Sequence, residues 1–235
     1  MTGLPAAVAP LRLADGDTLA DLVTFLRRAQ RADPSGAARL VAHGDVLAVY
    51  VAAVAGPGPL VLGLRTLALA EVSGADATLP LESLLSALEG ATDVTLALPS
   101  GGPSTATARP AGAGWAGVTP PRRGWEPVGA LDPELLAERA AAGIAQVATG
   151  TPPGAGAAAV AALRGRVWGA PLVAALPDLP AGTAFAVQVL GFADPTAPAA
   201  VYRCGPWWRV TTSRGHVLAR RPVLGPPLVA GPSPG

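Results

Sequence analysis

The stretch "ARLVAHGDVLAVYVAAVAGPGPLVLGLRTLALAEV", residues 38–72, decides the fold of the N-terminal half. It holds three apolar runs, which the turn sequences "HGD" and "GPGP" separate. Runs rich in Val and Leu and bounded by Gly and Pro are typical of strands, and such short turns favour an antiparallel meander. We therefore expect strands at 38–42, 46–54 and 60–72. Because these strands are almost wholly apolar, they need cover on both faces or a partner on one of them.

Helices flank this meander on both sides. Apolar residues recur at helical spacing between Thr18 and Gln30, and Asp17 or Thr18 is positioned to cap this helix. The pattern also predicts a helix at Leu81–Leu88 and a strand at Val94–Leu98. The N-terminal part is therefore expected to be an α-β-β-β-α-β unit, and the expected fold class is α+β.

The second half combines helices with a final meander. Asp132 and Pro133 form a strong helix start, and this helix is predicted to end near Val147. A further helix is predicted at 157–168, and residues 180–192 fit a helix or a strand, with the helix favoured. A three-stranded antiparallel meander is then expected, with strands at 199–204, 207–212 and 216–221.

Composition suggests how the chain is divided. Residues 99–131 are rich in Gly, Pro, Ser and Ala, which is typical of a connector. The expected parts are an N-terminal α+β domain, this Pro/Gly-rich connector, a helical segment with the C-terminal meander, and a flexible tail, at 1–98, 99–131, 132–225 and 226–235. Whether the two halves are separate domains stays open at this point.

Two resemblances concern these segments. The sequences "RGWEPVGALDPELLAERAAAGIAQVA" (123–148) and "PWWRVTTSRGHVLAR" (206–220) resemble conserved actinobacterial proteins that have no assigned function. The N-terminal order of a helix, three strands and "ATLPLESLLSALEGATDVTLAL" (77–98) is similar to one domain of a DNA sliding clamp. The second half does not continue the clamp pattern, and no clamp signature residue is present. This resemblance therefore implies the fold of one domain and no activity.

Charge is unevenly distributed along the chain, whose formal net charge is +1. Residues 1–138 carry nine Arg and fourteen Asp or Glu, whereas residues 139–235 carry eight Arg and only Asp178 and Asp194. A basic C-terminal part favours an anionic partner. The absence of lysine, together with 29 Gly and 26 Pro, is typical of a GC-rich genome. The choice of Arg over Lys therefore carries no functional meaning here.

The sequence predicts a soluble cytoplasmic protein without membrane contact. The longest uncharged apolar run, Val46–Leu64, contains "GPGP", which reads as a turn between strands and not as the middle of a spanning helix. The first residues lack the basic and continuous apolar segments of a signal peptide. A single cysteine fits a reducing compartment.

The stretch "VYRCGPWWRVTTSRGHVLARR", residues 201–221, collects the residue types that carry chemistry in other proteins. Cys204 and His216 are a thiol–imidazole pair, but the expected meander separates them along its middle strand by about 15 Å, too far for a dyad. Ser213 and His216 share a hairpin loop, but no acidic residue follows Asp194 to orient the imidazole. Two His and one Cys match no metal-ligand spacing, and "GTPPGAG" lacks the Lys-Ser/Thr of a phosphate-binding loop. We expect no catalytic residue, metal or cofactor.

The same stretch supports nucleic-acid binding as an alternative, because Arg and Trp together stack on bases and contact phosphates. Alternation along the strands predicts that Arg203, Trp207 and Arg209 share one face. Helices followed by a hairpin also match the element order of a winged helix, but "AGTAFAVQVL" lacks the polar outer face of a recognition helix. The predicted contact with an anionic partner consists of Arg203, Trp207, Arg209, Arg214, Arg220 and Arg221.

The leading hypothesis is a non-catalytic cytoplasmic protein-interaction or scaffold protein. It would contact a protein partner or self-associate through its apolar N-terminal sheet. Nucleic-acid binding through the basic C-terminal meander is the alternative, and an enzyme would need a cleft in which Ser213 or Cys204 meets a base.

Overall fold

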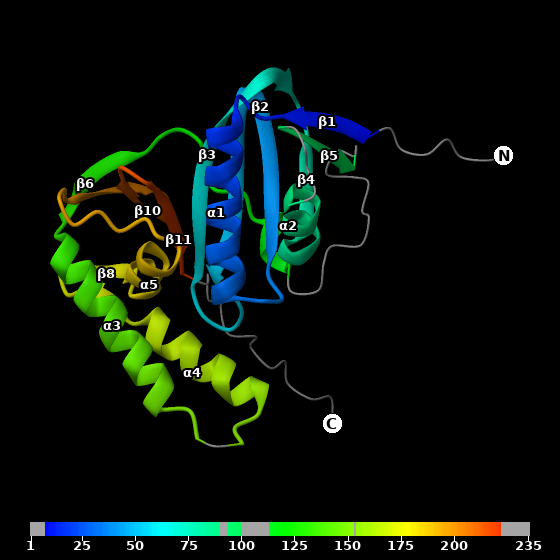
Figure 1. Ribbon diagram of the computed structural model, residues 1–235. Helices are drawn as coiled ribbons and strands as arrows, with labels where there is room; N and C mark the ends of the chain where they lie inside the picture. The colour runs from blue at the N-terminus through cyan, green and yellow to red at the C-terminus, as the bar shows by residue number, and fades with distance from the viewer. Residues whose placement is uncertain (1–7, 90–93, 100–112, 153, 222–235) are drawn as a thin grey trace, which may run out of the picture.

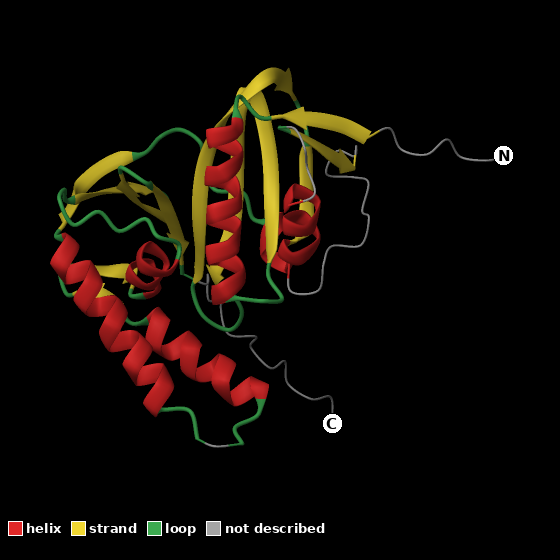
Figure 2. Ribbon diagram, in the orientation of Figure 1, coloured by secondary structure: helices red, strands yellow, loops and turns green. Residues whose placement is uncertain are grey.

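A computed structural model describes residues 8–89, 94–99, 113–152 and 154–221 of the chain (Figure 1). Helices and antiparallel strands form separate layers, which confirms the α+β class (Figure 2). The elements in chain order are β1 (Val8–Arg12), α1 (Gly16–Ala32), β2 (Ala37–Val54), β3 (Leu60–Ser73), β4 (Asp76–Pro80), α2 (Leu81–Glu89), β5 (Thr95–Pro99), η1 (Ala113–Gly117), β6 (Glu126–Leu131), α3 (Pro133–Thr149), α4 (Ala157–Gly169), β7 (Pro171–Val173), β8 (Leu176–Pro180), α5 (Gly182–Val189), β9 (Ala199–Cys204), β10 (Trp207–Thr212) and β11 (Gly215–Arg220).

One seven-stranded antiparallel sheet runs through both halves of the chain. Its strand order is β4-β2-β3-β11-β10-β9-β6. The halves meet where β3 pairs with β11, from Leu60 opposite Arg220 to Leu64 opposite His216. Two ribbons, β1 with β5 and β7 with β8, lie outside this sheet. Backbone hydrogen bonds between β3 and β11 therefore join the N-terminal and C-terminal halves directly.

The expected turn at "HGD" is wrong, because β2 is one continuous strand of 18 residues. Gly44 has a φ of +63°, and the pairing with β3 shifts register between Gly44 and Val46. Such an irregularity bends a strand without ending it, and glycine adopts the required left-handed conformation without a Cβ clash. The strand pairs with β4 before this point and with β3 after it. The third strand of the α-β-β-β-α-β order is therefore β4, which the sequence pattern did not predict.

Helices cover one face of the sheet. Helices α1 and α5 lie against β2 and β3 on the same side, and α2 packs beside α1 (Figures 1 and 2). Asp15 caps α1, in place of the expected Asp17 or Thr18, because its carboxylate accepts a hydrogen bond of 2.8 Å from the Thr18 amide. Phe25 of α1 stacks on Phe192 just after α5, with ring centroids 5.5 Å apart. The core thus continues from the N-terminal to the C-terminal half.

Gly63 of β3 allows α5 to approach the sheet closely. A Cβ atom at this position would lie 2.2 Å from Leu190 Cδ1 and 3.4 Å from Val51 Cγ2. Leu190 and Val51 are both almost fully buried, so a larger residue at position 63 would have to displace well-packed side chains. The absence of a side chain at Gly63 therefore sets the distance between the helix layer and the sheet.

The C-terminal half largely follows the predicted order. Asp132 caps α3 by accepting a 2.7 Å hydrogen bond from the Glu134 amide, and Pro133 begins the helix. Helix α5 confirms the helix favoured for residues 180–192. Strands β9, β10 and β11 confirm the C-terminal meander to within one residue at each end. The hairpin of β7 and β8 was not expected, and β6, which lies inside the predicted connector, is an edge strand that pairs with β9.

Parts of the expected division fall outside the described residues, namely 100–112 of the connector and the tail 226–235. The division into domains at 1–98 and 132–225 stays a prediction, and it has to accommodate a sheet that both segments share. Within the described residues, no helix is long and apolar enough to cross a membrane.

Candidate functional site

The candidate functional site is the face of the seven-stranded sheet opposite the helices, which we call the open face. Strand register assigns its residues, because directly paired residues of antiparallel strands point to the same side. Two adjacent rows cross this face from β9 to β2, and they consist of Tyr202, Arg209, Leu218, Leu62 and Ala52, and of Ala200, Thr211, His216, Leu64 and Tyr50. The open face therefore combines residues of both halves of the chain.

The segment from η1 to Trp125 covers the middle of the open face. Trp115 and Ala116 of η1 pack there in a small hydrophobic cluster with Leu62, Trp207 and Leu218. Trp115 and Trp125 both belong to this layer. A short irregular segment therefore covers this face, whereas a layer of helices covers the opposite face.

Arg39 of β2 holds this segment in place. Its guanidinium donates two hydrogen bonds to the Asp76 carboxylate, of 3.0 and 2.7 Å, one of 2.8 Å to the Ala116 carbonyl and one of 2.9 Å to the Thr119 hydroxyl. The side chains of Arg39 and Asp76 are only 15% and 23% exposed. Sequence reasoning did not single out Arg39, although a lone charge in the apolar run 38–42 is a signal that a partner is required.

Next to this cover, the open face becomes exposed along β2 and β3. Three cross-strand pairs point outward there, and we call these residues the apolar strip: Val46 and Ala68, Ala48 and Thr66, Tyr50 and Leu64. Tyr50 and Leu64 are partly buried against the η1 cluster, whereas Val46, Thr66 and Ala68 are exposed. Of these six residues, Thr66 alone is neither aliphatic nor aromatic. Val46 is 43% exposed, and nearby Val72 at the end of β3 is 81% exposed. Along a strand with one face in water, apolar residues toward the core ordinarily alternate with polar residues toward the solvent. In the apolar strip, the residues that point away from the helix layer are apolar as well.

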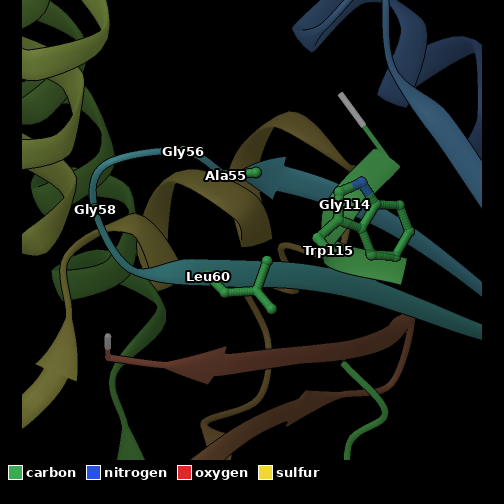
Figure 3. Close-up of a pocket in the computed structure, with 6 residues that line it drawn as sticks. All are labelled: Ala55, Gly56, Gly58, Leu60, Gly114 and Trp115. Carbon is green, nitrogen blue, oxygen red and sulfur yellow. The ribbon is translucent and has the colours of Figure 1, made fainter. Parts of the chain in front are cut away.

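A shallow depression of about 440 Å³ lies at the other end of β2 and β3, beside the "GPGP" turn (Figure 3). Its walls come from the turn, from Leu60 of β3 and from Trp115 of η1, and the complete lining is Ala55, Gly56, Gly58, Leu60, Gly114 and Trp115. This lining is apolar or glycine, so it offers side-chain packing and no charged group to orient a polar substrate.

Arg209 lies on the open face with its guanidinium over two aromatic rings. The Cζ atom is 4.3 Å from the ring centroid of Tyr202 and 4.8 Å from that of Trp125. These distances are within the range of cation–π attraction. The Arg209 Nε atom is buried and has no hydrogen-bond partner within the described residues.

His216 stands on the row next to Arg209. Its Nδ1 atom is 3.0 Å from the Thr211 hydroxyl oxygen. Burial lowers the pKa of His216 below the ordinary value of 6.5, and the positive charges of Arg209 and Arg65 lower it further. The imidazole is therefore neutral at neutral pH, and the open face carries its positive charge on arginine.

Neither expected pair of nucleophile and base comes together in the described part of the chain. The Ser213 hydroxyl donates to the Asp194 carboxylate and not to His216. This hydrogen bond, together with those from Thr196, lowers the pKa of Asp194 to about 2. Cys204 lies opposite Trp207 at one end of the meander and His216 lies near the other end, as strand geometry predicts.

The six residues of the predicted anionic contact do not form one surface. Trp207 is only 4% exposed, because it packs beneath η1. Arg203 lies opposite Trp208 in the register, with its Cζ atom 5.2 Å from the centre of that ring. The prediction that Arg203 and Arg209 share a face is wrong. The hairpin pairs odd-numbered residues of β9 with even-numbered residues of β10, so Arg203 points to the opposite side of the sheet.

The other predicted contact residues are also dispersed. Arg221 donates a 3.0 Å hydrogen bond to the Gly169 carbonyl and lies 3.9 Å from Asp178. Arg214 is exposed at the tip of the β10–β11 hairpin, and Arg220 is half-buried on the open face. Arg209 and Arg220 are thus the predicted cations that the register brings together on this face.

A metal site requires several ligands close together, and a substrate site requires a cavity with suitably placed polar groups. Among residues 8–89, 94–99, 113–152 and 154–221, no three His, Cys, Asp or Glu side chains gather closely enough to hold a metal ion. A second depression, of about 330 Å³, lies between α3 and α5, and its lining includes Glu134, Gln188 and Asp194. The lining also includes Thr212, whose hydroxyl donates to the Gly215 carbonyl and not to a carboxylate. That the protein needs no cofactor stays a prediction.

Two family models each match a part of the chain. Residues 6–108 match a family described as a domain of unknown function (DUF8010), and residues 120–224 match a second one (DUF8185). No curated protein matches the sequence. A crystal structure of a DNA polymerase sliding clamp from Pseudomonas aeruginosa with ligand is similar at 9% sequence identity and a TM-score of 0.43, over 94% of this chain and 66% of that chain. A likeness this remote has no bearing on function, and the actinobacterial resemblance stays a prediction.

Proposed function

We propose that the protein is a non-catalytic interaction or scaffold protein that self-associates through the apolar strip of its open face. The observation that supports this proposal is the composition of the strip, in which Val46, Ala48, Tyr50, Leu64 and Ala68 point outward from the sheet. Covering such residues is favourable by about 25 cal/mol per Å² of apolar surface removed from water. A second copy of the chain supplies an equally apolar strip.

The geometry favours protein interaction over the two alternatives. Nucleic-acid binding through the C-terminal meander would require several exposed cations on one surface, whereas Arg203 and Arg209 lie on opposite faces and Trp207 is buried. An enzyme of the kind considered would require a base near Ser213 or Cys204. The Ser213 hydroxyl instead donates a hydrogen bond to the Asp194 carboxylate, and the Cys204 thiol contacts the Arg123 carbonyl at 3.6 Å.

The test is the molar mass of the full chain as a function of concentration, measured by light scattering with size-exclusion chromatography. We expect the mass to rise with concentration for the unaltered protein and to remain that of a monomer for Val46→Asp, because a carboxylate on the strip opposes its burial. Val128→Asp is the matched control. Val128 is also a strand valine with 43% exposure, but it lies on β6, away from the strip.

Two outcomes would contradict the proposal. One is a monomeric mass at every concentration for the unaltered protein. The other is equal association of the Val46→Asp and Val128→Asp variants, which would place the contact elsewhere on the molecule.

A further inference from the structure

Arg209 is a cation that is held in place without a counter-ion. It forms no ion pair within the described residues, which include every acidic residue of the chain except Asp93. The two acidic residues of the C-terminal part are engaged elsewhere, Asp178 beside Arg221 and Asp194 with Ser213. A guanidinium that is withdrawn from water in this way ordinarily has a carboxylate or phosphate partner.

The Arg209 side chain is also oriented before any ligand binds. The rings of Tyr202 and Trp125 hold its planar end, and the Nε atom is shielded from solvent. The two terminal amino groups form no hydrogen bond within the described residues and, unlike the Nε atom, are not fully buried. A fixed guanidinium with two free amino groups is suited to bidentate binding of a carboxylate.

The surroundings of Arg209 add positive charge and apolar surface. Arg220 is its charged diagonal neighbour on β11, and the neutral His216 is the other, on the same face. Leu62, on the Arg209 row, is covered by η1, but Leu64 of the apolar strip lies on the adjacent row, two strands from β10, or about 10 Å at the usual strand spacing. A carboxylate bound at Arg209 would therefore stand within one short segment's length of the strip.

We propose that Arg209 binds a carboxylate from an acidic, apolar-flanked segment of the protein that covers the open face. This inference rests on the proposed function in that the ligand belongs to a protein, and it adds the chemistry by which that protein is recognised. Charge complementarity supports it, because the register places Arg209 and Arg220 on this face without a carboxylate bonded to Arg209. A nucleic acid fits less well, since a phosphate backbone requires a line of cations and Arg203 lies on the opposite face.

The probe is an acetylated and amidated hexapeptide of alternating leucine and glutamate, compared with the same peptide carrying glutamine. Calorimetry measures both affinities for the full chain. We expect the glutamate peptide to bind at least tenfold more tightly, and we expect the ¹⁵N–¹H signal of the Arg209 Nε group to shift on binding. This comparison needs no variant, so it holds even where a substitution disturbs folding.

Variants then assign the preference to one side chain. Arg209→Gln should abolish the tenfold preference, whereas Arg209→Lys should keep part of it, because lysine retains the charge and loses bidentate geometry. Arg214→Gln is the matched control and should keep the full preference. Arg214 is an exposed arginine on the same hairpin as Arg209, and its side chain has no ion pair within the described residues.

Each remaining outcome decides the matter. Equal affinity for the two peptides, or a preference that survives Arg209→Gln, would overturn the inference. Tighter binding of a single-stranded oligothymidylate, lost in Arg209→Gln, would overturn it in favour of a phosphate ligand. An Arg209-dependent preference in a protein that is monomeric at every concentration would support the carboxylate site and refute self-association, so the two proposals fail separately.

Discussion

Replacing Arg39 by alanine removes four hydrogen bonds that join β2 to β4 and to the segment across the open face. Each hydrogen bond to a charged group contributes about 1.5–3 kcal/mol, but the four share one guanidinium and do not add. Removing one partner of a buried ion pair costs about 3–5 kcal/mol. Because the side chains of Arg39 and Asp76 are still 15% and 23% exposed, we take the lower end of this range. The expected loss is about 3 kcal/mol in the free energy of unfolding.

Arg27 provides the matched control for this prediction. Its guanidinium donates two hydrogen bonds to Glu89, of 3.3 and 2.9 Å, but both side chains are more than half exposed. An exposed ion pair contributes about 0–1 kcal/mol, so Arg27→Ala should be nearly neutral. Burial is therefore the main difference between the two pairs.

The assay is equilibrium unfolding in urea, followed by circular dichroism, with thermal unfolding as a second measurement. For a chain of this size, a loss of about 3 kcal/mol corresponds to a fall of about 6–12 °C in the unfolding temperature. A double-mutant cycle with Asp76→Ala isolates the coupling between Arg39 and Asp76, which should exceed about 1 kcal/mol. If Arg39→Ala costs no more than Arg27→Ala, Arg39 does not hold the segment and the argument from burial fails.

Three further predictions use the same unfolding assay. Gly63→Ala places a methyl group 2.2 Å from Leu190 and should cost about 1–3 kcal/mol. Gly74→Ala, with nothing within 4 Å of the added methyl, is its control, and equal costs would refute the packing argument. Asp132→Ala removes the cap of α3 and should lower the free energy of unfolding by about 1 kcal/mol, whereas Asp132→Asn should keep most of the stability. An alanine variant as stable as the unaltered protein would contradict the capping role. For His216 the folded pKa lies below 6.5, so the unfolded chain binds more protons between these values. The stability contribution of His216 is therefore full above pH 6.5 and is lost as the pH falls through its folded pKa. His216→Gln should flatten the pH dependence of stability in this window, and an unchanged dependence would exclude His216 as its source.

Local signals in the sequence were sufficient for most elements. The Asp-Pro start of α3 and the apolar spacing of α1 and α2 predict helices, because capping and amphipathic periodicity depend on residues close in the chain. The strands of the C-terminal meander were predicted for the same reason, since short hairpin turns leave a recognisable Gly signal. The prediction of a turn at "HGD" was wrong because the same residues suit a turn or a bent strand. Only the pairing with β3 and β4 distinguishes these two conformations.

The site itself depended on contacts that no local pattern records. The sequence alone determined that the N-terminal strands are apolar enough to need a partner or cover, and that Cys204 and His216 lie far apart. Only the tertiary structure decided which apolar residues remain exposed, because β3 pairs with a strand more than 150 residues further along the chain and η1 folds back over Trp207. Strand register, which sequence alternation does not specify across a hairpin, then placed Arg203 and Arg209 on opposite faces. Hydrogen bonding between distant strands thus placed Arg209 on the open face, where it has no ion pair within the described residues.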